Sequence, residues 1–199
     1  MIIADDVLMA RAVLIGDSSV GKTCLVNQFI HNEFNPQEVS TIGALYETYS
    51  STVNGKRIEL QIWDTSGQEK FKSLGPVYYR DAAAAILVFD LTSRNSFLNL
   101  SSWLNLFKNV TGGQSIIVVV GNKKDLSDSV NVTENEAREW AASFGYNFFV
   151  TSAKNGEGVK EVFESLMHSL VEKENDVRSR VFQQLPKKQY VETNKSCGC

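Results

Sequence analysis

Several features are scarce in this sequence, and each scarcity argues against a class of protein. The longest uninterrupted apolar run is 82–89, far short of the roughly 18 residues that span a bilayer, so we expect no membrane-spanning helix. Residues 1–6 contain acidic side chains where a secretion signal needs basic ones, which argues against a secreted protein. The net charge is −3, without the basic excess of a nucleic-acid binder, so we expect no nucleic-acid partner. We therefore place the protein in the cytosol or on the cytosolic face of a membrane.

Cysteine is also scarce, since the chain has three, an odd number whose spacing fits no disulfide framework. Cys24 follows a Lys-Thr pair that opens a predicted helix, so we interpret it first as a small buried residue. Cys197 and Cys199 fall within the last three residues. Exposed thiols are a liability on a cytosolic surface, and no second cysteine pair could complete a zinc site with them, so this pair needs another explanation.

The sequence otherwise has the composition of an ordinary globular protein, with 43% hydrophobic and 22% charged residues. Apolar strand-like runs alternate with stretches of helical period. An Asn-Gly pair at 54–55 predicts a hairpin, and continuous apolar runs such as 83–89 are typical of parallel strands buried on both faces. We expect strands at 12–15, 45–53, 57–63, 83–89, 116–120 and 147–151, and helices at 21–30, 96–110, 133–144 and 159–170.

This order of elements predicts an α/β fold of three layers. We expect a six-stranded, mostly parallel sheet with one antiparallel hairpin strand, flanked by five helices. In such sheets, ligands bind at the carboxyl ends of the strands. After residue 173 the helical period dissolves into a polar segment, so we predict one domain over residues 1–173 and a flexible tail over 174–199.

Residues 16–23 have the sequence Gly-Asp-Ser-Ser-Val-Gly-Lys-Thr, which fits the phosphate-binding pattern G-x-x-x-x-G-K-[ST] between a predicted strand and a predicted helix. Backbone N–H groups and the helix N-terminus attract anions there, Lys22 supplies a charge for the β- and γ-phosphates, and Thr23 is the expected magnesium ligand. The loop residues expected to bind the nucleotide are Ser18, Ser19, Val20, Gly21, Lys22, Thr23 and Cys24.

The phosphate loop alone does not choose among nucleotide-binding proteins, because adenylate kinases and ATPases share it. A small-molecule kinase needs an arginine-rich lid, and no arginine cluster follows the loop. A GTP-loaded scaffold that does not hydrolyse GTP is a second alternative, which a single-turnover hydrolysis assay separates from a GTPase.

Three further segments lie at predicted strand ends, where the ligand should be. In the first, Asp64 can hold magnesium through water, the Gly67 N–H can bond the γ-phosphate, and Gln68 can orient the attacking water. In the second, the Asp125 carboxylate suits the N1–H and N2–H pair of guanine, which adenine lacks. The third is Ser-Ala-Lys at 152–154. Each motif is weak alone, but together and in this order they predict GTP and GDP as ligands, with Mg²⁺.

With these motifs, the sequence resembles the Ras superfamily, and within it the Rab family, over about residues 10–172 and at the final Cys-Gly-Cys. The resemblance implies a P-loop GTPase fold and a switch that hydrolyses GTP slowly unless a GTPase-activating protein accelerates it. It implies that Thr41 closes on magnesium and the γ-phosphate and that Phe34 packs against guanine. It assigns catalysis to Gln68, the metal to Thr23, Thr41 and Asp64, and the base to Asn122, Lys123, Asp125, Ser152, Ala153 and Lys154.

The resemblance also implies an effector patch made of Ile42, Gly43, Tyr46, Trp63 and Tyr78, although Trp63 could instead be a core residue only. Two positions depart from the family pattern: serine stands at Ser66 where alanine is usual, and tyrosine at Tyr46 where phenylalanine is more usual. These departures leave nucleotide binding intact and bear on effector choice and hydrolysis rate. Segments 41–44 and 74–81 are most similar to the early-endosomal Rab subgroup.

The chain's ending is similar to the double-cysteine ending of Rab proteins, on which both thiols are geranylgeranylated. Stable membrane anchoring takes two signals, and the few lysines near Cys197 and Cys199 supply too little charge to be the second. The resemblance implies a monomer on the cytoplasmic face of membranes, with endosomes favoured, and a cytosolic pool bound to a GDP-dissociation inhibitor. Its other implied partners are an exchange factor, a GTPase-activating protein, a Rab escort protein and effectors.

Overall fold

The sheet at the centre of the molecule has six strands in the order β2-β3-β1-β4-β5-β6. The computed structural model describes residues 7–68, 75–175 and 177. The strands are β1 Leu8–Ile15, β2 Ala44–Val53, β3 Lys56–Thr65, β4 Ala84–Asp90, β5 Ile116–Asn122 and β6 Asn147–Val150. Only the β2–β3 pair is antiparallel, and the other pairs are parallel. The predicted α/β class and hairpin are therefore confirmed.

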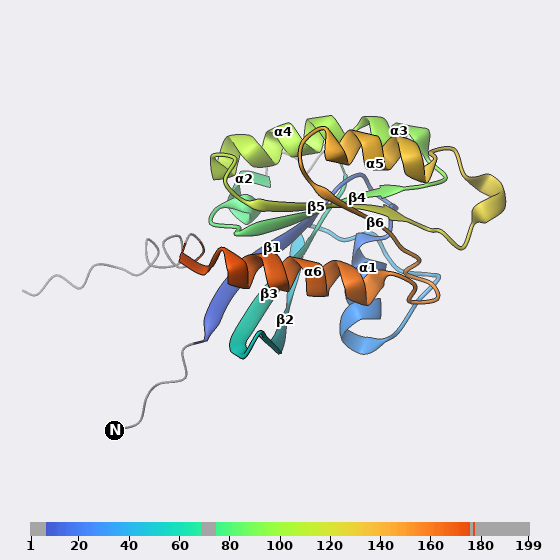
Figure 1. Cartoon of the computed structure of the whole chain (residues 1–199). Coiled ribbons are helices and arrows are strands. Elements are labelled where there is room, and N and C mark those ends of the chain that lie inside the picture. Colours follow the sequence, from blue (N-terminus) through green and yellow to red (C-terminus); the bar gives the residue numbers. More distant parts are fainter. Residues whose placement is uncertain (1–6, 69–74, 176, 178–199) are drawn as a thin grey trace, which may run out of the picture.

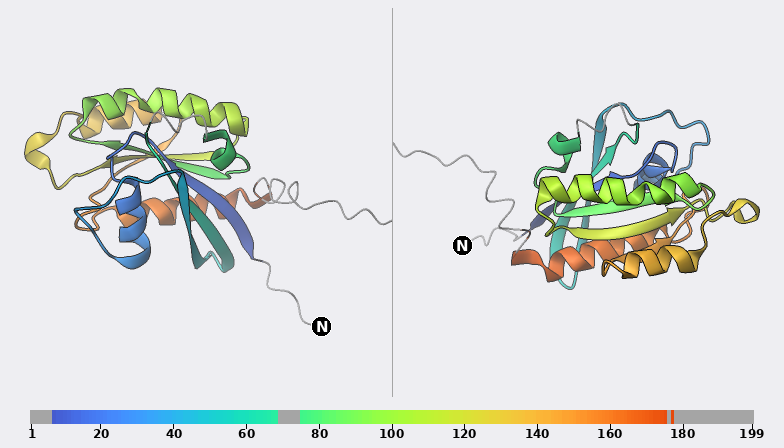
Figure 2. Two further views of the ribbon diagram at one scale, coloured as in Figure 1. Left: turned by 180° about the vertical axis from the view of Figure 1, so that it is seen from behind. Right: turned by 90° about the horizontal axis from the view of Figure 1, so that it is seen from above.

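Helices cover both faces of this sheet (Figure 1). On one face lie α1 Lys22–His31 and α6 Val159–Glu172. On the other lie α2 Gly75–Tyr79, α3 Arg94–Leu98, α4 Leu100–Thr111 and α5 Glu134–Ala142. Figure 2 shows the same three layers from behind and from above. The carboxyl ends of the parallel strands therefore meet at one edge, between the two helical layers.

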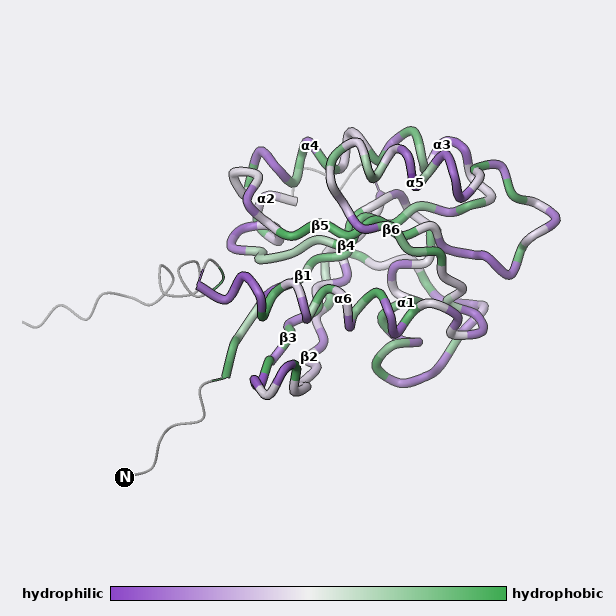
Figure 3. Tube along the Cα trace, in the orientation of Figure 1, coloured by the Kyte–Doolittle hydropathy of each residue, from purple (hydrophilic) through white to green (hydrophobic). Residues whose placement is uncertain are grey.

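Two hydrophobic cores lie on opposite sides of the sheet, and alternation along each strand divides residues between them. In β1, Leu14 packs in the core under α1 and α6, whereas Val13 packs in the core under α4 and α5. Both faces of β4 are buried throughout, which explains its continuous apolar run. The central strands are accordingly the most hydrophobic part of the chain trace (Figure 3).

The helix that we predicted over 96–110 is two helices, α3 and α4, which meet at Asn99. The first begins earlier than predicted because the Ser93 hydroxyl accepts the Ser96 N–H at 3.4 Å and caps its first turn. Asn99 itself has helical backbone angles, φ −73° and ψ −12°, so the chain changes little in direction there. What distinguishes this position is its side chain, which bonds to the phosphate loop.

The packed part of the chain extends beyond residue 173, where we predicted that the tail begins. Glu174 forms an ion pair with Lys56 of β3, and Val177 is 3% exposed within the core under α6. The polar composition after residue 173 concealed this one apolar contact. Residues 178–199 lie outside the described part. Among the described residues, no helix is both long and apolar enough to cross a membrane.

Candidate functional site

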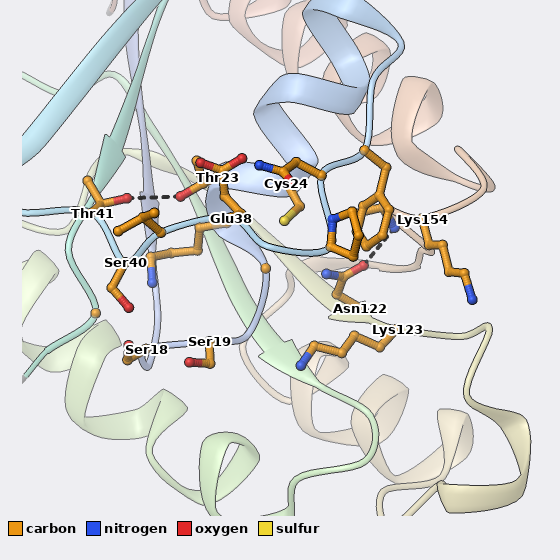
Figure 4. Close-up of a pocket in the computed structure, with 18 of the residues that line it drawn as sticks. Ser18, Ser19, Thr23, Cys24, Glu38, Ser40, Thr41, Asn122, Lys123 and Lys154 are labelled. Carbon is orange, nitrogen blue, oxygen red and sulfur yellow. Dashed lines mark hydrogen bonds between the residues drawn. The ribbon is translucent and has the colours of Figure 1, made fainter.

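A cavity of about 510 Å³ opens at the carboxyl ends of the strands (Figure 4). It is lined by the phosphate loop, by the segment after α1, by the end of β3 and by the loops after β5 and β6. The predicted nucleotide residues among its lining are Ser18, Ser19, Gly21, Lys22, Thr23, Cys24, Phe34, Thr41, Gly67, Asn122, Lys123, Asp125, Ala153 and Lys154. Segments far apart in the sequence thus converge on one pocket.

The phosphate loop owes its shape to two glycines with positive φ, Gly16 at +145° and Gly21 at +95°. A Cβ on Gly16 would lie 2.1 Å from the Val88 carbonyl oxygen, so a larger residue does not fit against β4. Lys22 is buried, and its ammonium donates to the carbonyls of Gly16 at 2.9 Å and Asp17 at 2.7 Å. Burial lowers the pKa of Lys22 to about 8, and a phosphate placed beside it would raise that pKa again by favouring the charged form.

Three oxygen-bearing side chains from three segments converge at the mouth of this loop. The Asp64 carboxylate accepts a hydroxyl from Thr23 at 2.7 Å and from Thr41 at 2.9 Å, and the two hydroxyls lie 2.9 Å apart. The other Asp64 oxygen, Oδ1, is buried and has no hydrogen-bond partner in the described structure. Burial raises the pKa of Asp64. This all-oxygen ligand set suits a hard divalent cation such as Mg²⁺, which these side chains would hold.

Asn122 ties the base side of the cavity to the phosphate loop. It is 1% exposed, and its amide donates to the Val20 carbonyl at 2.9 Å. Its side-chain oxygen accepts the Thr151 hydroxyl and the Ala153 N–H, each at 3.1 Å. Every polar atom of the carboxamide therefore serves to join three loops, so Asn122 acts mainly by holding the walls in place.

Asp125 presents a carboxylate to the cavity, and its orientation comes from neighbouring loops. One oxygen accepts the Ser152 hydroxyl at 2.6 Å, and the Lys154 ammonium lies 4.0 Å from the other. Lys123, with φ at +69°, pairs through its ammonium with Asp90 at 2.7 Å. A carboxylate oriented in this way can accept the paired N–H donors of guanine.

Some predicted site residues, Asp64 among them, do not line the cavity. Val20 and Ser152 do not line the cavity; they position Asn122 and Asp125 through the bonds above. Gln68 does not line it either, and its backbone N–H donates to the Ser66 hydroxyl at 3.4 Å. The catalytic role of Gln68 stays a prediction. Glu38 lines the cavity although no motif indicated it, because it stands in an irregular segment without a pattern.

The residues predicted as an effector patch form one surface beside the cavity. Tyr46 stacks on Trp63 with ring centroids 5.3 Å apart, and the ring centroids of Trp63 and Tyr78 lie 6.2 Å apart. Tyr46 is 60% exposed and Ile42 is 78% exposed. Trp63 is half-buried, so it packs against the core and also supports the exposed ring of Tyr46. The predicted lipidation residues, Cys197 and Cys199, lie outside the described residues.

The chain is similar to one protein family and to several known proteins over most of its length. A family model described as the Ras family matches residues 11–172, a span that contains every residue lining the cavity. The human Ras-related protein Rab-21 is 40% identical over 162 residues, or 81% of this chain and 72% of that protein. Rab-21 of Geodia cydonium is 41% identical over 163 residues, 82% and 71% of the two chains. Ras-related protein Rab-2B of Dictyostelium discoideum is 42% identical over 163 residues, or 82% of this chain and 81% of that protein.

Proposed function

The chain belongs to the Ras family, within its Rab branch of GTP hydrolases, and from this membership we propose that it is a GTP/GDP switch acting in endosomal vesicle traffic. The observation that carries the proposal is the joining of three chemistries at one cavity, where Asp64 contributes through its bonds to the lining residues Thr23 and Thr41. Lys22 offers a charge to phosphates, Thr23, Thr41 and Asp64 offer oxygens to a cation, and Asp125 offers a carboxylate to guanine. No simpler ligand needs all three.

The switching mechanism follows from how the first switch segment, residues 34–43, reaches the cavity. Its Thr41 hydroxyl lies against Asp64 and Thr23, and its Gly43 carbonyl accepts the Ser66 N–H at 2.9 Å. The position of Thr41 is therefore tied to the start of the second switch. Mg²⁺ bound to these oxygens would neutralise charge on the phosphates. Loss of the γ-phosphate would remove a shared contact and let both segments move.

Hydrolysis requires an oriented water and stabilisation of charge in the transition state. We propose Gln68 as the residue that orients the water. The first switch, residues 34–43, contains no arginine that could stabilise the transition state from within the chain. Intrinsic hydrolysis should therefore be slow, and a GTPase-activating protein that supplies the missing charge should accelerate it.

The membrane part of the proposal rests on Cys197 and Cys199. Geranylgeranyl groups on both thiols would supply the two signals that stable anchoring requires. An escort protein would present the chain for this modification, and a GDP-dissociation inhibitor would shield the lipids in the cytosol. The exchange factor and effectors would meet the protein on the membrane, with effectors reading the patch of Tyr46, Trp63 and Tyr78. We assign the membrane to endosomes from the resemblance of segments 41–44 and 74–81.

Competition binding and single-turnover hydrolysis test the proposal together. The purified protein should release bound fluorescent GDP to excess GTP or GDP but retain it against excess ATP. It should hydrolyse GTP in a single turnover, and Gln68→Leu should keep GTP binding while slowing hydrolysis. Equal competition by ATP would exclude a guanine site. Tight GTP binding without hydrolysis, alone and with a GTPase-activating protein, would instead identify a non-hydrolysing scaffold.

A further inference from the structure

The phosphate loop carries an acidic side chain, Asp17, which two side chains at and just after the junction of α3 and α4 hold in place. Its Oδ2 accepts the Asn99 amide at 2.7 Å, and its Oδ1 accepts the Trp103 indole N–H at 2.7 Å. Asn99 lies where α3 meets α4, and Trp103 lies one turn into α4. The contacts join residues 82 and 86 positions apart in the chain. We call these three residues the loop clamp.

A carboxylate is an unexpected side chain in a loop shaped to bind anions. Left free, it could turn toward the phosphates and repel them. In the structure Asp17 does not line the cavity, whereas the next two residues, Ser18 and Ser19, do. Hydrogen bonds from N–H donors to a charged acceptor are strong. The two bonds therefore hold the negative charge of Asp17 away from the cavity.

Both donors of the loop clamp are well fixed. Trp103 is 1% exposed and packs in the core between the sheet and α4, so its ring cannot follow a moving loop. Asn99 ends one helix and begins the next, yet its side chain caps neither helix. The amide is therefore available to Asp17. This also explains why an asparagine, a weak helix former, interrupts the stretch that we predicted as one helix.

The main chain of Asp17 contacts two parts of the phosphate site. Its carbonyl accepts the Lys22 ammonium at 2.7 Å. On the other side, a Cβ built on Gly67 would lie 2.3 Å from the carbonyl carbon and oxygen of Asp17, so the start of the second switch rests on this peptide. Any rotation of Asp17 would therefore disturb the lysine that meets the phosphates and the glycine that senses the γ-phosphate.

We propose that Asn99 and Trp103 are positioning residues for nucleotide binding. They hold Asp17 so that the phosphate loop keeps the shape in which it binds the phosphates. This proposal rests on the proposed function, because it concerns how long the protein retains GDP and GTP. The helical layer of α3 and α4, on the sheet face opposite α1, thereby controls nucleotide release from a position that touches no nucleotide (Figure 1).

Nucleotide dissociation measured on paired variants of the full chain tests the clamp. Asn99→Asp places a second carboxylate against Asp17, and Trp103→Phe removes the indole donor while keeping an aromatic ring. Each should speed release of fluorescent GDP, in the presence of Mg²⁺ and excess unlabelled GDP, by about tenfold or more. Asp17→Asn added to Asn99→Asp should restore slow release, because the new carboxamide can donate to Asp and still accept from Trp103.

Two control variants separate this role from general destabilisation. Asn95→Asp adds the same charge at an exposed position of α3, and Trp140→Phe makes the same ring change on α5. Neither should alter GDP release, and urea unfolding of every GDP-loaded variant should show whether Trp103→Phe merely weakens the core. Native release rates in both Asn99→Asp and Trp103→Phe, or no recovery in the double variant, would overturn the clamp. Failure of the native chain to retain GDP at all would instead overturn the proposed function.

Discussion

Asp125→Asn should change the base preference of the site from guanine to xanthine. Guanine presents an N1–H and an N2–H pair, both of which the Asp125 carboxylate can accept. An asparagine keeps one acceptor oxygen but places an N–H₂ where the second acceptor was. Xanthine carries a carbonyl in place of the guanine amino group, so the new N–H₂ finds an acceptor there. The change reverses the hydrogen-bonding requirement at one point of the base.

The expected loss of GDP affinity depends on the hydrogen bonds between Asp125 and guanine and on how far the carboxylate is exposed to water. The Asp125 side chain is 16% exposed, so water only partly replaces lost contacts. The one hydrogen bond that is lost, made to a charged group, contributes about 1.5–3 kcal/mol. The asparagine N–H₂ and the guanine N–H₂ would then face each other without an acceptor, which costs about 1–3 kcal/mol more, so the total is about 2.5–6 kcal/mol. The GDP dissociation constant should therefore rise roughly 10²- to 10⁴-fold. Folding should change little, because the Ser152 hydroxyl, now 2.6 Å from Asp125 Oδ1, can donate to the amide oxygen as well.

Isothermal titration with GDP, XDP and ADP measures this prediction directly. Asp128→Asn is a matched control, since it makes the same change at an exposed position three residues further along the chain. That control should bind GDP like the native protein. If Asp125→Asn kept native GDP affinity, or lost GDP and XDP binding equally while remaining folded, the assignment of Asp125 to the base would be wrong.

Three further outcomes follow from the structure. Thr23→Asn should lower GTP affinity more than GDP affinity, because its lost hydroxyl meets Asp64 and Thr41 at the cation site, and competition of the two nucleotides for the variant measures the ratio. Replacing both Cys197 and Cys199 with serine should leave GTP binding unchanged but make the protein wholly cytosolic; intact-mass analysis that found unmodified thiols on membrane-bound native protein would refute lipidation. Leu166→Ala, at a site that is 0% exposed in the core under α6, should lower the free energy of unfolding by about 2–5 kcal/mol, measured by urea titration of the GDP-loaded protein.

The sequence by itself determined the fold class and the place of the site. Period-two and helical patterns are local properties, so they predicted the strands and most helices without knowledge of their neighbours. The phosphate loop and Asp125 each follow a strand, Asp64 lies at the end of another, and parallel strands bring their carboxyl ends to one edge. That topological rule predicted convergence of the motifs before any coordinate was known.

Only the tertiary structure decided which motif residues face the cavity and which support it. Asn122 and Asp125 belong to one short motif and both line the cavity, yet Asn122 joins loops through three buried bonds whereas Asp125 presents its carboxylate to the ligand space. The local sequence pattern around Trp103 favours a packing role, because an indole on an apolar helix face shows no sign of its distant acceptor. Its bond to Asp17 joins residues 86 positions apart, and such a contact depends on how α4 packs against the sheet, which no local pattern encodes.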